Sequence, residues 1–351
     1  MATSRALTIA GVRVLRGETR DVRLKISETY TGDAVTIPLR VVRGPKAGPT
    51  VFVTAAVHGD ELNGTGIVHD LMFDQELKLK AGTLLLAPAI NVFGLENHVR
   101  YLPDRRDLNR AFPGSEKGSL ASRIAAIVMR EIIGKSDFGI DLHSASFQRT
   151  NFPNIRGNLN DPAIRRLARA FGCELLVHGP GPVGSLRREA SKAGCPTIIL
   201  EAGEPFKMEP TVVELGRRGV YNVLIDLGMM TGVPTVPPFQ TRADKTKWVR
   251  AEIGGILRFH VMPGGLVRAG DVVATNYSLF GLEQNALLSP VDGIVLSVLT
   301  LPAVKPGEPV CHIAVPGKKL ASIEKAIMAM DPSHPHVMLR NELASGVSLA
   351  R

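Results

Sequence analysis

The fold is decided by one stretch of the chain, which reads VFVTAAVHGDELNG and runs from Val51 to Gly64. Its first seven residues form an apolar run of strand length, and polar residues that suit the start of a helix follow at once. Three similar runs occur at 83–87, 138–142 and 196–200. A run without polar alternation is typical of a strand that is buried on both faces. The sequence therefore predicts a sheet that is covered by helices on both sides.

Helical patterns separate these runs, and they lie at 62–73, 120–133, 162–171 and 212–227. Strands that alternate with helices predict an α/β fold with a mostly parallel or mixed sheet. We assign residues 46–235 to this α/β domain. Residues 1–45 alternate charged and apolar side chains, which predicts a β-rich N-terminal segment packed on the α/β domain.

The chain becomes β-rich again after a Pro-rich linker at 231–238. Residues 243–316 contain two Gly-Ile/Pro-Gly half-motifs, at 255–271 and 293–308, and this repeat resembles the small β-barrel of biotinyl and lipoyl carrier domains. No Lys occurs from 269 to 304, so this barrel cannot carry a lysine-linked cofactor there. Residues 317–351 are predicted to form one helix, at 320–330, and a surface tail.

The composition excludes several classes of protein. The chain has 351 residues, and 42 Lys+Arg against 33 Asp+Glu give a formal charge of +9. In the N-terminal segment the basic residues alternate with apolar ones as on a solvated strand, which argues against a nucleic-acid partner. No apolar run approaches the ~18 residues of a membrane helix. Three cysteines without paired spacing favour buried thiols, and we expect a cytoplasmic protein.

A metal site is indicated by His58-Gly59-Asp60-Glu61, where the first buried strand ends. His and Glu three residues apart can take two corners of a metal site, and His143 follows another apolar run as a third ligand. Two His and one Glu with an open water position form the ligand set of catalytic zinc. We therefore expect one Zn²⁺ per chain, although other divalent metals suit the same ligands.

Two further clusters suit hydrolysis. Glu201 ends a third apolar run and is the candidate general base for a metal-bound water. The segment 100–110 contains four Arg, which suits an anion site, because guanidinium groups bind carboxylates in a bidentate manner. The alternative interpretation, a solvated basic loop without a binding role, applies to Arg105 and Arg106 and is weaker for Asn109 and Arg110. The remaining histidines fit no ligand spacing and are expected to be satisfied or on the surface.

Four motifs occur in order: HGDELNG at 58–64, DLNRAFPG at 107–114, DLH at 141–143 and EAG at 201–203. Together they resemble the succinylglutamate desuccinylase/aspartoacylase family of the zinc carboxypeptidase clan. The resemblance implies zinc on His58, Glu61 and His143, with Glu201 as general base and acid. It also implies an arginine at the substrate carbonyl, where Arg100 matches best and Arg105 stays open.

The resemblance further implies that Asn109 and Arg110 hold a substrate carboxylate, and that Arg187, or else Arg188, holds a second one. The implied activity is zinc-dependent hydrolysis of the amide bond of a small N-acyl amino acid. A zinc carboxypeptidase or other peptide-amide hydrolase is the alternative, and a non-catalytic carboxylate-binding protein is a third interpretation. The acyl group and the amino acid stay open, and a homodimer is expected from general frequencies.

Overall fold

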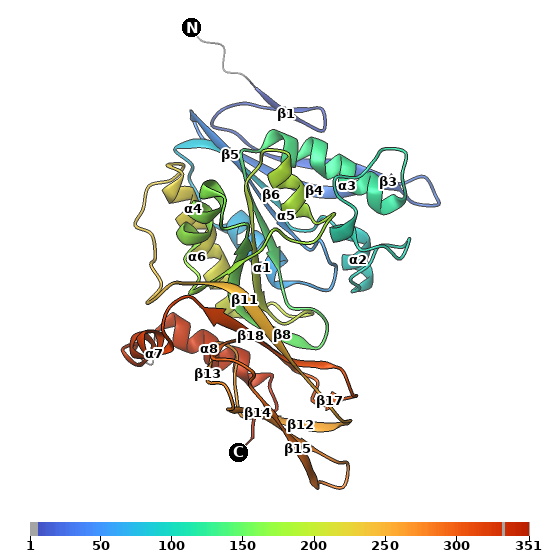
Figure 1. The fold of residues 1–351 in the computed structure, drawn as a ribbon. Coiled ribbons are helices and arrows are strands. Elements are labelled where there is room, and N and C mark those ends of the chain that lie inside the picture. Colours follow the sequence, from blue (N-terminus) through green and yellow to red (C-terminus); the bar gives the residue numbers. More distant parts are fainter. Residues whose placement is uncertain (1–5, 332–333, 351) are drawn as a thin grey trace.

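The computed structural model describes residues 6–331 and 334–350, and its main feature is a twelve-stranded mixed sheet (Figure 1). The strand order is β13-β16-β18-β11-β9-β8-β10-β7-β5-β6-β4-β3. The strands are β3 (Thr19–Glu28), β4 (Ala34–Arg43), β5 (Lys46–Ala55), β6 (Ala81–Ala87), β7 (Phe138–His143), β8 (Arg149–Gly157), β9 (Leu175–His178), β10 (Thr197–Gly203), β11 (Thr241–Arg250), β13 (Leu266–Val267), β16 (Gly293–Leu299) and β18 (Pro309–Pro316). Strands β6, β5, β7 and β10 run parallel to one another. The pairings of β3 with β4, of β4 with β6 and of β8 with β10 are antiparallel, as are most pairings of the C-terminal strands.

Helices cover both faces of this sheet, as the sequence predicts. One face packs against α1 (Asn63–Phe73), α4 (Pro162–Phe171) and α6 (Pro210–Asp226), and the other against α2 (Val92–Asn97), α3 (Leu120–Glu131) and α5 (Leu186–Lys192). Strand β5 contributes side chains to the hydrophobic cores on both faces of the sheet. Val51 and Val53 point to the first core and Phe52 to the second, and all three are fully buried.

The N-terminal segment is β-structure. Strands β1 (Leu7–Ile9) and β2 (Val12–Val14) pair with each other, and β3 and β4 extend the main sheet through the antiparallel pairing of β4 with β6. Ile9, Val22 and Ile37 of this segment are buried in the same core as α3. The segment therefore continues the catalytic sheet.

The C-terminal β-rich part divides its strands between two sheets. Strands β12 (Gly255–Phe259), β14 (Val272–Tyr277), β15 (Glu283–Leu288) and β17 (Ala303–Val304) form a separate four-stranded sheet, whereas β11, β13, β16 and β18 continue the main sheet. Leu257 and Phe259 share a core with Val295 and Cys311 between the two sheets. Strand β16 also pairs with β8, which partly closes the main sheet. The likeness to carrier domains stays a prediction.

The chain ends in two helices, α7 (Leu320–Met328) and α8 (Pro335–Ser345), where the sequence predicts one helix and a surface tail. Helix α8 buries Leu339 and Leu343 in the main core. Its Arg340 also donates to Glu174 at 2.6 Å. The sequence predicts a turn at residues 331–336, whereas α8 begins at Pro335, where the missing N–H of proline costs nothing. Residues 332–333 of that turn lie outside the described residues.

In the part of the chain that the structure describes, no helix has both the length and the apolar character needed to cross a membrane.

Candidate metal centre and active site

The three predicted metal ligands meet at the carboxyl ends of two neighbouring parallel strands. His58 and Glu61 lie in the loop between β5 and α1, and His143 is the last residue of β7, which pairs with β5. The loop passes so close to α2 that a Cβ on Gly59 would lie 1.9 Å from the carbonyl carbon of Gly94. Only glycine fits at this position, and the tight turn brings His58 back toward Glu61.

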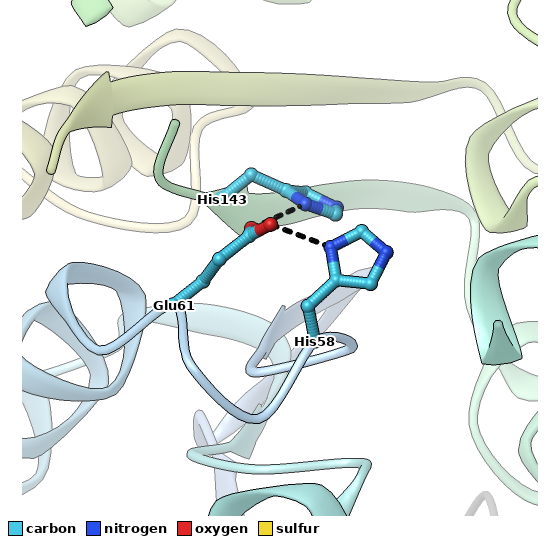
Figure 2. Close-up of side chains that lie close together, drawn as sticks. All are labelled: His58, Glu61 and His143. Atoms are coloured by element: carbon cyan, nitrogen blue, oxygen red, sulfur yellow. Dashed lines mark hydrogen bonds and ion pairs between the residues drawn. The ribbon is translucent and has the colours of Figure 1, made fainter. Parts of the chain in front are cut away.

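Glu61 bridges the two histidines (Figure 2). Its Oε1 lies 2.6 Å from Nδ1 of His58, and its Oε2 lies 2.8 Å from Nδ1 of His143. The candidate ligand atoms of the three residues all lie within 4.8 Å of one another, and all three side chains are buried. The backbone N–H of Ser144 donates to Oε2 of Glu61 at 3.1 Å and fixes the carboxylate further.

Two aspartates hold the far nitrogens of these histidines. Nε2 of His58 lies 3.1 Å from Oδ1 of Asp107, and Nε2 of His143 lies 2.9 Å from Oδ2 of Asp141. Histidines that bind metals usually donate their other ring N–H to a carboxylate, which fixes the tautomer. With a metal bound, both Nδ1 atoms would be free of protons and available as ligands beside Glu61. This donor set fits a zinc ion.

The charges of the cluster depend on one another. Burial by itself raises the pKa of Glu61, but the adjacent His58 and His143 outweigh burial and hold that pKa below its ordinary value. Burial by itself lowers the pKa of His143, but Asp141 and Glu61 raise it well above its ordinary value. In the absence of a metal the cluster therefore retains protons, and a cation that binds there must displace them.

Glu201 lies on β10, directly beside the metal ligands. It is the register partner of His143 in the parallel pairing of β10 with β7. Nδ2 of Asn151, on β8, donates to Oε2 of Glu201 at 3.0 Å, and Nη1 of Arg156 lies 3.9 Å from Oε1. The carboxylate lines the same cavity as His58, Glu61 and His143, with a volume of about 250 Å³.

Of the two candidate carbonyl arginines, the structure brings Arg100 to the cavity. Arg100 donates to Glu61 at 3.3 Å and to Asp107 at 3.0 Å. Arg105 is exposed and is not among the residues that line the cavity.

The predicted carboxylate-binding pair also lines the cavity. Asn109 is buried, and its Oδ1 accepts the N–H of Leu186 at the start of α5, which orients the amide group. Arg110 follows it in the 3-10 helix Leu108–Arg110 and donates from Nη1 to the carbonyl of Asn109 at 2.7 Å. The side-chain oxygen of Asp107 accepts the N–H of Asn109 and holds this turn beside His58.

Arg187 and Arg188 differ clearly in their surroundings. Arg187 is 8% exposed, lines the cavity, and has no hydrogen-bond partner at Nε or Nη1 among the described residues. Burial lowers its pKa to about 10, and Arg156 acts in the same direction. Arg188 instead donates to the carbonyl of Gly181 at 3.0 Å and is not among the lining residues. The geometry therefore favours Arg187 as a ligand-binding group.

Several residues of the site escaped the sequence analysis. Asp107 and Asp141, which hold the two histidines, lie inside quoted motifs, so their spacing to Asn109 and His143 was a usable signal. Six further residues line the cavity and come from strands that only the fold brings together, namely Arg149, Asn151, Arg156, Trp248, Ser297 and His312. His312 also departs from the expectation that the remaining histidines are satisfied or on the surface, because its buried Nε2 has no partner in the described structure.

Comparisons with known proteins agree with this geometry. The model of the succinylglutamate desuccinylase/aspartoacylase catalytic domain matches residues 47–227. The N-alpha-acetyl-L-2,4-diaminobutyric acid deacetylase of Halomonas elongata is 26% identical over 295 residues, which are 80% of this chain and 86% of that protein.

Solved structures show the same fold. A succinylglutamate desuccinylase/aspartoacylase from Rhodobacter sphaeroides is 26% identical, with a TM-score of 0.75 over 86% of this chain and 96% of that chain. The product-bound ectoine utilization protein EutE (DoeB) of Ruegeria pomeroyi is 23% identical, with a TM-score of 0.77 over 89% of this chain and 99% of that chain. The ordered motifs, the family model and these structures agree, and the chain belongs to the succinylglutamate desuccinylase/aspartoacylase family.

Proposed function

We propose that the protein is a zinc-dependent deacylase that hydrolyses the amide bond of a small N-acyl amino acid. The observation that carries this proposal is the pair of histidines whose Nδ1 atoms converge on Glu61 while aspartates hold their Nε2 atoms. Glu201 stands on the next strand as a second carboxylate of the same cavity. This arrangement supports one zinc ion per chain on His58, Glu61 and His143.

Zinc at such a site supplies a water of lowered pKa and polarises a bound carbonyl. Glu201 takes a proton from the attacking water and returns it to the leaving amine, which is the work of a general base and acid. Asn151 donates to one oxygen of Glu201 and so helps to orient this carboxylate in the cavity wall. Arg100 lies beside Glu61 and stabilises the negative charge that develops on the carbonyl oxygen.

The substrate is positioned by its carboxylates. Asn109 and Arg110 hold the α-carboxylate, and the unpartnered nitrogens of Arg187 hold a second anionic group of the amino acid. The relative from Halomonas elongata is named as a deacetylase of an N-acetylated amino acid, which supports an N-acyl amino acid as substrate. A carboxypeptidase would use the same metal and carboxylate groups, so peptides belong in the test.

The test is amine release from a panel of N-acyl amino acids and dipeptides, with zinc-loaded wild type, Glu201→Gln and Glu214→Gln. Glu214 is a half-exposed glutamate in α6 that pairs with Arg217, and it serves as the matched control. We expect turnover of at least one N-acyl amino acid, loss of ~100-fold or more in Glu201→Gln, and no change in the control. Turnover of dipeptides alone would favour the carboxypeptidase, and silence on the whole panel by a zinc-loaded protein would refute both activities.

A further inference from the structure

Asn63 is a buried amide that lies behind the metal site. It is the first residue of α1, follows the metal ligand Glu61 by two positions and is only 1% exposed. It is not among the residues that line the cavity, so neither the proposed chemistry nor substrate binding uses it. Buried polar side chains are kept where they have hydrogen-bond partners, so the partners of Asn63 indicate its role.

The amide group of Asn63 contacts two other loops. Its Oδ1 accepts the backbone N–H of Glu209 at 2.7 Å, and its Nδ2 donates to Oε2 of the same residue at 2.9 Å. The same Nδ2 lies 3.2 Å from the carbonyl oxygen of Glu204 and 3.4 Å from that of Ala202, both after the base Glu201. It also lies 3.2 Å from Oγ of Ser144, which directly follows the ligand His143. One side chain therefore joins three segments that carry the site.

The backbone joins the same three segments around Asn63. The N–H of Phe206, in the loop after β10, donates to the carbonyl of Asp60 in the loop between β5 and α1 at 2.7 Å. The N–H of Ala145, after β7, donates to the carbonyl of Gly203 at the end of β10 at 3.0 Å. The N–H of Ser144 donates to Glu61 at 3.1 Å and joins the remaining pair of segments.

The loop after β10 is held in a shape that it would not adopt alone. Phe206 has a φ of 60°, in the left-handed region that bulky residues avoid. Gly203 has a φ of 71°, and a Cβ there would lie 2.0 Å from Oε2 of Glu209. That oxygen also accepts the N–H of Glu204 at 2.9 Å. The contacts with Asn63 and Glu209 thus fix the chain that leaves Glu201.

The surroundings of Asn63 specify an amide. Its oxygen faces an N–H donor, whereas its nitrogen faces the oxygens of Ala202, Glu204 and Glu209. An aspartate has the same shape, but it would place an acceptor oxygen among acceptors, next to the buried carboxylate of Glu209. The same volume with the wrong hydrogen-bonding group would therefore push the three segments apart.

We propose that Asn63 is a positioning residue of this site, which sets the place of Glu201 relative to the metal ligands by holding the three segments together. It acts on the chemistry through its neighbours in the chain and contacts neither the metal ligands nor Glu201. The proposal rests on the proposed function, because it takes Glu201 as the group that moves the proton.

The first test compares zinc-loaded wild type, Asn63→Asp and Asn222→Asp on an accepted substrate. Asn222 is 5% exposed in α6 and clamps Thr235 in the same way, with Nδ2 donating to its carbonyl at 2.9 Å and Oδ1 accepting its N–H at 2.8 Å. It is therefore the matched control for a buried amide that holds a loop.

We expect Asn63→Asp to lower kcat by ~10-fold or more, because small displacements of a reacting group cost large factors in rate. Its KM should stay within ~2-fold of the wild-type value, since the carboxylate-binding residues are not touched. The zinc content should stay at one per chain, because His58 and His143 keep their aspartate partners. Asn222→Asp should lower stability and leave kcat of the folded protein unchanged.

Three results would overturn the proposal: a wild-type kcat in Asn63→Asp, a loss that added zinc fully restores, or an equal loss of kcat in Asn222→Asp. Circular dichroism checks the fold of both variants. If Asn63→Asp does not fold, Asn63→Ser, which adds no charge, takes its place with the same expected split between kcat and KM.

Hydrogen exchange measured by mass spectrometry separates this proposal from the proposed function. The amides of Ser144, Ala145 and Phe206 donate the bonds between the three segments, so peptides over 144–146 and 204–209 should exchange ~10-fold or more faster in Asn63→Asp and at the wild-type rate in Asn222→Asp. This result in a protein that turns over no substrate would support the coupling of the segments and refute the deacylase. Unchanged exchange in folded Asn63→Asp would overturn the proposal, whatever the turnover.

Discussion

Asp141→Asn tests whether the buried aspartates organise the metal site. Asp141 is fully buried, accepts from Thr54 Oγ1 at 2.8 Å through one oxygen, and holds Nε2 of His143 at 2.9 Å through the other. Asparagine keeps the volume but loses the negative charge that makes His143 a stronger ligand. Outer carboxylates of this kind typically contribute 10- to 100-fold to metal affinity. We therefore expect zinc to bind ~10- to 100-fold more weakly, or roughly 1.4–2.8 kcal/mol.

The assay is competition for zinc against a chromogenic chelator, as a function of pH. In the wild type the raised pKa of His143 makes protons compete with zinc, so affinity rises with pH until that pKa is passed. Without the Asp141 charge the pKa of His143 falls, so the affinity of Asp141→Asn should level off at a lower pH, and the difference between the two proteins should widen as pH increases.

The matched control is Asp137→Asn, just before the opposite end of the same strand, where Oδ2 of Asp137 accepts the N–H of Thr50 at 2.7 Å. This variant should bind zinc like the wild type. Wild-type affinity in Asp141→Asn, or equal losses in the two variants, would refute the assignment of Asp141 as the group that orients His143.

Three further outcomes are expected. A chelator should abolish hydrolysis and lower the melting temperature, and added zinc should restore both; full activity after verified metal removal would contradict the metal assignment. Asn151→Leu should lower kcat by ~10-fold with unchanged zinc content, because Glu201 loses a donor at 3.0 Å; a change in zinc content instead would make Asn151 structural. Arg340→Met should cost about 3 kcal/mol or more of unfolding free energy in urea, because it leaves Glu174, which is 1% exposed, without its arginine; a change below about 1 kcal/mol would show that α8 does not depend on this pair.

The sequence was sufficient to predict those features whose pattern lies within one short segment. The run from Val51 to Val57 predicts a strand buried on both faces because all of its side chains except Thr54 are apolar, and the structure confirms this for both cores. His58 and Glu61 are close in sequence, and His143 ends a run of the same kind, so the rule that ligands gather at the carboxyl ends of strands was enough to bring all three together.

Other features depend on contacts between distant segments, which a single sequence does not encode in any local pattern. Helix α8 exists because Leu339 and Leu343 find the main core and Arg340 finds Glu174, which lies 166 residues earlier. The C-terminal strands alternate in the same way whether they close a separate barrel or divide between two sheets. Only long-range pairing decides between these, and here β16 pairs with β8 of the catalytic domain.

The same distinction separates the chemistry of this enzyme from its specificity. The metal ligands belong to a loop and a strand end, β5–α1 and β7, whose motifs lie in the parallel part of the sheet. The cavity wall formed by Trp248, His312, Ser297 and Asn151 depends instead on the register of four strands. A shift of one residue in β18 would turn His312 to the opposite face and bring Cys311 or Ile313 into the cavity, without moving His58, Glu61 or His143. Substitutions in β11, β16 and β18 can therefore change this wall of the cavity without changing the metal ligands.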